Sequence, residues 1–223
     1  MEAGSVPRRE PTAGERARAA EAAEVARGGW VPADPGPLGL AGFAMTTFVL
    51  SMFNADLVSA AGEPVVLGLA VAYGGLAQLL AGMWEFRTGN TFGAVAFSSF
   101  GAFWLSFFAL VIWFGPTGSS ATHIAAANAG DAVGLYLWAW AIFTAYMCVA
   151  SLRTTGAVFL VFALLTATFV LLAAGEVGAN TTVTHWGGYI GIADAAAAWY
   201  ASFAAVTNST FARTILPVVP LRR

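Results

Sequence analysis

Long apolar runs, separated by short polar stretches, follow one another along the chain. A membrane-spanning helix needs about 20 predominantly apolar residues, because the hydrocarbon core is about 30 Å thick. Backbone groups in lipid must satisfy their own hydrogen bonds, so each such run is expected to be helical. Residues 38–55, 64–84, 91–114, 132–152, 155–174 and 187–206 meet this test.

Composition supports a membrane protein. Hydrophobic residues make up 58% of the chain and charged residues 10%, whereas a soluble domain carries about a quarter charged residues. The sequence therefore predicts an all-α polytopic membrane protein with six transmembrane helices over residues 34–210, multi-pass in the plasma membrane. Residues 1–33 are predicted to be a polar, largely disordered cytoplasmic tail, and residues 211–223 a second cytoplasmic tail.

The arginines predict the orientation. All ten basic residues are arginines, and they fall only in the two tails and in the second-to-third and fourth-to-fifth loops. The other three loops carry acidic residues at their edges. Cytoplasmic loops of membrane proteins carry the excess of Lys and Arg, so both termini are predicted to be cytoplasmic. An even number of spans agrees with this.

Polar side chains within the spans are candidates for a transport route, because such groups are costly in lipid. The candidates for lining a substrate pathway are Thr46, Thr47, Ser51, Asn54, Gln78, Ser98 and Ser99. For the hydroxyls, a bond back to the preceding helical turn is an equally good explanation. Glu85 is interpreted as half of an ion pair or as a protonatable site. Asp194 is interpreted as a proton relay or as a hydrogen-bonded residue of the bundle.

The residues that an enzyme would need are missing from the sequence. His123 and His185 are the only histidines and form no metal-binding motif, and the single cysteine, Cys148, lies in an apolar run. No nucleophile elbow or phosphate-binding loop is present. We expect no catalytic residue, no metal, no cofactor and no nucleic-acid partner.

Three blocks of sequence resemble the acetate uptake transporter family, which includes bacterial succinate–acetate permeases and fungal acetate permeases. Asp34, Pro35, Gly36, Pro37, Leu38, Gly39 and Leu40 resemble its signature NPAPLGL at the start of the first helix. Residues 74–86, 89–93 and 97–105 are similar to its second and third helices. Residues 213–217 match its carboxy-terminal tail, so the resemblance covers residues 34–217.

The resemblance implies a homohexamer of six-helix subunits, each with its own conduit. Family members pass acetate, other short monocarboxylates and in some cases succinate, often together with protons. By motif, a hydrophobic constriction is expected at Phe43, Phe100 and Leu165, the last from a looser alignment. Larger acids such as lactate should pass when Leu165 is shortened.

Two residues depart from the family pattern. Phe100 stands where the family has Tyr, which removes a hydroxyl from the constriction. Asp34 replaces the signature Asn, and it can still cap the first helix. An ionised Asp34 would, however, repel an anion where a helix amino terminus would attract it. These departures concern substrate choice and proton dependence.

Two other functions fit the same sequence. One is a channel for urea, amides or ammonia. The other is an acetate-responsive membrane sensor that signals through its arginine-rich tail. Whether transport of acetate would use a channel or a proton-coupled carrier is left open by the residues.

Overall fold

The six predicted spans are confirmed as helices. The computed structural model describes residues 12, 14, 16 and 32–221, so the predicted tail over residues 1–33 lies almost wholly outside the described residues. Six helices of the described part are long and apolar enough to cross a membrane. They are α2 (Gly36–Asn54), α3–η2–α4 (Val65–Val71, Ala72–Ala77, Gln78–Thr88), α5–η3 (Thr91–Ala109, Leu110–Phe114), η4–α6 (Ala126–Asn128, Ala129–Ser151), α7 (Gly156–Val177) and α8 (Thr181–Thr210).

Polar caps set where several helices begin. The side chain of Asn90 accepts a bond from the Gly93 amide at 3.1 Å at the start of α5. Thr155 caps α7 in the same way. Asn180 accepts from the Val183 amide at 3.2 Å, and this cap starts α8 six residues before the predicted 187. Such caps satisfy amides that the first helical turn leaves without partners.

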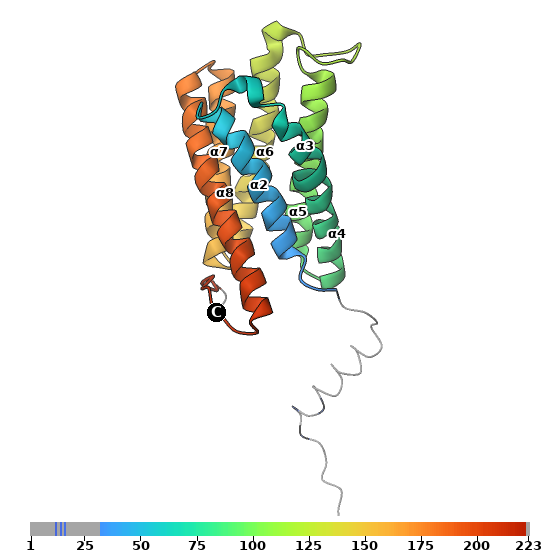
Figure 1. Cartoon of the computed structure of the whole chain (residues 1–223), viewed down its shortest axis with the longest axis vertical. Coiled ribbons are helices and arrows are strands. Elements are labelled where there is room, and N and C mark those ends of the chain that lie inside the picture. The colour runs from blue at the N-terminus through green and yellow to red at the C-terminus, as the bar shows by residue number, and fades with distance from the viewer. Residues whose placement is uncertain (1–11, 13, 15, 17–31, 222–223) are drawn as a thin grey trace, which may run out of the picture. The chain divides into compact units, whose positions relative to one another are not determined.

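Helices α2 and α8 pack side by side and antiparallel (Figure 1). At one end, the Ser202 hydroxyl donates to the Pro37 carbonyl at 2.7 Å. At the other end, Gly188 of α8 lies directly against the backbone of Ala55, just after α2. Helix α8 also packs on α7, and α7 packs on α6. The register between α2 and α8 is thus fixed at both ends.

The second span approaches α2 through a wide π-helical turn, η2. A side chain at Gly42 of α2 would collide with the Tyr73 carbonyl, which lies 2.6 Å from its Cβ position. Gly74 in η2 faces the Thr46 hydroxyl in the same tight contact. Small residues at such contacts let helix backbones approach closely, which is the main source of packing in lipid.

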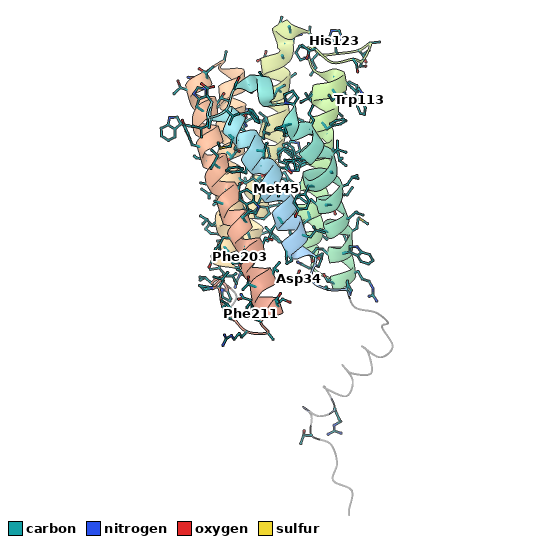
Figure 2. The ribbon with its side chains drawn as sticks, viewed as in Figure 1. Asp34, Met45, Trp113, His123, Phe203 and Phe211 are labelled. Carbon is teal, nitrogen blue, oxygen red and sulfur yellow. The ribbon has the colours of Figure 1, made fainter. Side chains whose placement is uncertain are left out.

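The two ends of the bundle differ in charge. We call the end that carries Arg87, Arg153 and Arg213 the arginine end. The other, the distal end, carries Glu63 and Glu176. Figure 2 shows Asp34 and Phe211 at the first end, and Trp113 and His123 at the second.

Residues 211–221, predicted as a tail, fold back on the arginine end. The Asn208 side chain accepts bonds from the amides of Ile215 at 2.7 Å and Leu216 at 2.9 Å, and it donates to the Leu216 carbonyl at 2.8 Å. The Val219 carbonyl accepts from Gly156 at 2.7 Å. Val219 has a φ of 52°, which is unusual for a β-branched residue. The segment is therefore held by several independent bonds.

Candidate functional site

Two cavities enter the bundle from opposite ends. The arginine-end cavity has a volume of about 470 Å³ and is lined by residues of α2, α4, α5, α7, α8 and the carboxy-terminal segment. The distal cavity has a volume of about 330 Å³ and is lined by residues of α2, α5, α6 and α7 among others. Helices α2, α5 and α7 thus contribute to both cavities.

On each of these three helices, one stripe of residues runs from the first cavity to the second. On α7, Val158 and Phe162 line the arginine-end cavity, and Phe169 and Leu172 line the distal one. Leu165 lies between them at helical spacing, so it faces the same way. Phe162 and Phe169 are seven residues apart, so the section between the cavities is about 10 Å long at 1.5 Å per residue.

The other two helices carry equivalent stripes. On α5, Ala96 lines the first cavity and Phe103 the second, with Phe100 between them. On α2, Leu40 lines the first cavity and Leu50 the second. Phe43 and Thr47 occupy the positions between these two leucines. The predicted constriction residues therefore fall between the cavities on all three helices.

The section between the cavities is apolar and closely packed. Phe43, Phe100 and Leu165 are 5%, 3% and 4% exposed and belong to one hydrophobic cluster. The rings of Phe43 and Phe100 have centroids 5.9 Å apart. The Phe100 ring also lies 6.1 Å from Phe162 and 6.5 Å from Phe169. The structure thus brings the three predicted residues together.

Phe162 and Phe169 are site residues that the sequence analysis missed. They flank Leu165 at spacings of three and four residues, and each forms part of a cavity wall. The spacing of the three side chains along one helical face was the available signal. On α7, the section between the two cavities therefore consists of Leu165 with the rings of Phe162 and Phe169 at its ends.

Several predicted pathway residues lie instead at contacts between helices. Thr46 faces Gly74 and bonds back to the Gly42 carbonyl at 2.9 Å. Ser51 faces Gly191 of α8, and Ser98 faces Gly82 of α4. None of these three hydroxyls lines either cavity. Their placement favours a packing role over direct contact with a solute.

The remaining pathway candidates are distributed differently. Asn54 lines the distal cavity. Thr47 is 5% exposed, and its hydroxyl has no hydrogen-bond partner among the described residues. Gln78 is 1% exposed and lines neither cavity, and Ser99 is half-buried on α5. Of this group, Asn54 and Thr47 lie on the α2 stripe.

The signature segment forms one wall of the arginine-end cavity. Asp34 lines this cavity, and its carboxylate accepts a bond from the Gly36 amide at 2.9 Å. Pro37 lines the cavity too, Pro35 and Gly39 are buried, and Leu38 is 44% exposed on the outer face. Two carboxyls meet here, because Glu85 also lines the cavity and is bonded to Thr88 at 3.1 Å.

A second pair of carboxyls lies at the distal end and was not among the predicted site residues. Glu63 and Glu176 both line the distal cavity and a neighbouring surface cavity of about 450 Å³. Burial, and then the nearby charge of Glu176, raise the pKa of Glu63. Like charges that share a site disfavour joint ionisation. Glu63 therefore binds its proton more tightly than an isolated glutamate would.

Asp194 lies deeper than either pair. It is 0% exposed in the middle of α8, and neither carboxyl oxygen has a hydrogen-bond partner within the described part of the chain. Taken together, the site consists of two cavities, a closely packed apolar section between them and acidic groups on both sides. This arrangement can admit a small solute from either end and force it to lose water in the middle.

Comparison with known proteins gives the following relatives. The family model described as the GPR1/FUN34/yaaH family matches residues 30–223. The chain is 46% identical over 177 residues to ammonia transport outward protein 2 of Saccharomyces cerevisiae. It is 43% identical over 198 residues to acetate permease A of Emericella nidulans. These matches cover 79% and 83% of the chain, and they span 62% and 65% of the length of the two fungal relatives.

A bacterial relative matches over nearly its whole length. The succinate-acetate/proton symporter SatP of Escherichia coli is 37% identical over 188 residues, which are 83% of this chain and 95% of the relative. The solved structure of the bacterial acetate channel SatP superposes with a TM-score of 0.77 at 36% identity. That comparison covers 84% of this chain and 99% of the other.

Proposed function

Because this chain belongs to the GPR1/FUN34/yaaH family, we propose that it conducts acetate and other short monocarboxylates across the plasma membrane. The chain is an integral, multi-pass membrane protein. Its similarity to an acetate permease, a succinate-acetate/proton symporter and an acetate channel supports this choice of substrate. Those relatives are transporters and channels, so the protein is not an enzyme.

One observation carries the proposal. The stripes on α2, α5 and α7 connect two cavities through a single buried section at Phe43, Phe100 and Leu165. A carboxylate without a partner costs several kcal/mol to desolvate in such a section. The neutral acid loses far less, so the dry section selects for a small solute that crosses together with its proton.

Each group has a proposed role. Phe43, Phe100 and Leu165 form the constriction, which selects by size and by exclusion of water. Asn54 and Thr47 replace water contacts on its distal side. Asp34 and Glu85, with the rest of the signature segment, form the vestibule at the arginine end. The net result is a proton-linked passage of monocarboxylates, with succinate as a larger competing substrate.

The test is uptake of labelled acetate by the purified protein in liposomes, measured over a range of pH with and without competing succinate. Neutral acetic acid crosses lipid unaided, so protein-free vesicles give the background. A Leu165→Trp variant, whose indole would fill the constriction, gives a matched background. We expect acetate uptake to exceed both backgrounds and to rise in proportion to the concentration of neutral acetic acid. Equal flux with the wild-type and Leu165→Trp proteins would refute the proposal.

Ammonia is the second candidate solute, because one relative is named for outward ammonia transport. Neutral ammonia is small and would also pass a dry section more easily than its cation. Flux of ammonia and of labelled urea, measured in the same vesicles as acetate, separates these solutes. If the protein is an acetate sensor, deletion of residues 1–29 should abolish a cellular response to acetate and leave acetate uptake intact.

Assembly and orientation are proposed along with the function. We propose a homohexamer with one conduit in each subunit, which mass measurement of the purified complex would test. The arginine distribution supports the proposal that both termini lie in the cytoplasm. Labelling of a cysteine introduced beside Arg153 in intact cells, compared with one introduced beside Glu63, tests that orientation.

A further inference from the structure

Three deeply buried polar side chains near the constriction lack a hydrogen-bond partner in the part of the chain that the structure describes. Thr47 of α2, Thr168 of α7 and Asp194 of α8 are 5%, 4% and 0% exposed. Neither hydroxyl, and neither carboxyl oxygen, finds a partner among the residues that the structure describes. An unpaired buried polar group costs about 1–3 kcal/mol. Four such atoms on three helices therefore call for an explanation.

The register of α2 and α8 places Thr47 level with Asp194. The two helices touch at Pro37–Ser202 and at Ser51–Gly191. These contacts are 14 residues apart on α2 (37 to 51) and 11 apart on α8 (191 to 202). Because the helices are antiparallel, moving four residues back from Ser51 corresponds to moving about three forward from Gly191. That step leads from Ser51 to Thr47 and from Gly191 to Asp194.

Thr168 lies at the same level of the helix bundle as Thr47 and Asp194. Its methyl carbon lies 3.4 Å from the Cβ position of Gly191, which also faces Ser51. Thr168 is one turn beyond Leu165 on α7, and Thr47 is one turn beyond Phe43 on α2. Both hydroxyls therefore lie immediately on the distal side of the constriction.

Asp194 lies on the face of α8 that lines the conduit. Asn208, Ala205 and Ala201 of α8 line the arginine-end cavity at helical spacing. The same spacing continues to Ala198, which is fully buried, and then to Asp194. The carboxyl thus continues a stripe that begins in a cavity wall, as the stripes of α2, α5 and α7 do.

The charged surroundings of Asp194 define its chemistry. Helix α2 carries no titratable residue, and the only one on α7 is Glu176, eight residues beyond Thr168. Along α8 itself the titratable side chains are His185, Tyr189 and Tyr200. With no cation on the facing turns, an ionised carboxylate would be costly. A neutral carboxyl offers one hydroxyl donor and one carbonyl acceptor.

We propose that Asp194, Thr47 and Thr168 form a binding site for the carboxyl group of a neutral monocarboxylic acid, directly distal to the constriction. The Asp194 hydroxyl donates to the carbonyl oxygen of the bound acid, and the hydroxyl of the acid donates to the Asp194 carbonyl oxygen. The two threonine hydroxyls donate to the remaining lone pairs. No proton changes its owner in this pairing. The site rests on the proposed function, because it assumes that such acids enter the conduit.

The experiment compares Asp194→Asn, Asp194→Leu and Thr47→Val in the liposome uptake assay. An amide pairs with a carboxylic acid as a carboxyl does, so Asp194→Asn should keep uptake within about twofold of wild type. Thr47→Val should raise the acetate KM roughly tenfold, the effect of one lost hydrogen bond. Asp194→Leu loses both bonds to the acid and should raise it roughly hundredfold. Thr144→Val is the matched control, because Thr144 is equally buried but bonds back to the Trp140 carbonyl at 2.7 Å.

A spectroscopic readout accompanies the kinetics. The carbonyl stretch of the protonated Asp194 carboxyl, assigned by its loss in Asp194→Asn, should shift when acetate is added. No shift, or a KM in Thr47→Val equal to that of Thr144→Val, would overturn the site. Asp194→Asn as inactive as Asp194→Leu would also overturn it, because a transferable proton would then be needed. Wild-type protein without acetate uptake would instead refute the proposed function.

Discussion

Shortening Leu165 should widen the constriction without opening the rest of the bundle. Leu165 is 4% exposed and lies between Phe162 and Phe169 on the section that separates the two cavities. Leu165→Ala removes three carbon atoms from the section between the two cavities. The remaining walls are Phe43 and Phe100, which belong to a closely packed aromatic cluster. Such a cluster moves little when a neighbouring side chain is shortened. The created space therefore remains available to solute.

The size of the effect follows from how hydrophobic sites discriminate. One additional carbon group on a substrate is worth about 1–3 kcal/mol in a close-fitting apolar pocket, or 10–200-fold in rate. Lactate exceeds acetate by such a group and a hydroxyl. We expect the ratio of lactate to acetate uptake to rise at least tenfold in Leu165→Ala, and less in Leu165→Val. The stability of the protein should fall by about 2–5 kcal/mol in Leu165→Ala.

The assay measures labelled lactate and labelled acetate in parallel vesicles, with thermal unfolding as a check on the fold. Leu164→Ala is the matched control, since Leu164 is half-buried on the same turn and lines neither cavity. An unchanged lactate-to-acetate ratio in a folded Leu165→Ala protein would refute the constriction at this residue. An equal rise in Leu164→Ala would show that general loosening of α7 is the cause.

Three further changes test the two ends of the conduit. Asp34→Asn keeps the acceptor for the Gly36 amide and removes a charge from the vestibule. Because a neutral acid does not respond to that charge, acetate uptake should stay within about twofold of wild type at low and at high salt. A rise at low salt alone would show that the anion is the species that enters, which contradicts passage of the neutral acid. Glu63 has a raised pKa in the folded protein, so the stability it contributes is present below the ordinary glutamate pKa and is lost as pH rises through the raised value. Glu63→Gln should therefore unfold at a higher temperature than wild type near neutral pH, with the difference vanishing in acid; a constant difference would exclude this cause. Asn208→Ala removes three hydrogen bonds to residues 215–216, which should cost about 1 kcal/mol each and expose this segment to limited proteolysis; unchanged cleavage would show that other contacts hold it.

The order and length of the transmembrane helices could be predicted from the local pattern of apolar residues. In lipid a backbone segment has no water to bond, so a sufficiently long apolar run can only be a helix. Prediction of the third span at residues 91–114 agrees with α5–η3 (Thr91–Phe114). The boundary of α8 was misplaced because its first turns are polar, and only the Asn180 cap shows where the helix begins. Motifs near residues 34, 74 and 100 likewise indicated the family before any contact was known.

Tertiary packing determines which neighbouring helix each polar side chain contacts. Thr46 and Thr47 are neighbours of the same type, yet Thr46 lies against Gly74 and bonds to its own helix, while Thr47 is buried without a partner. Spacing along a helix gives the residues that share a face, but not which neighbour that face meets. That Asp194 lies level with Thr47 follows from the α2–α8 register, which is set by two contacts between residues far apart in sequence. The sequence by itself determined which segments cross the membrane, whereas the conduit required the rotation and register of each helix against the others.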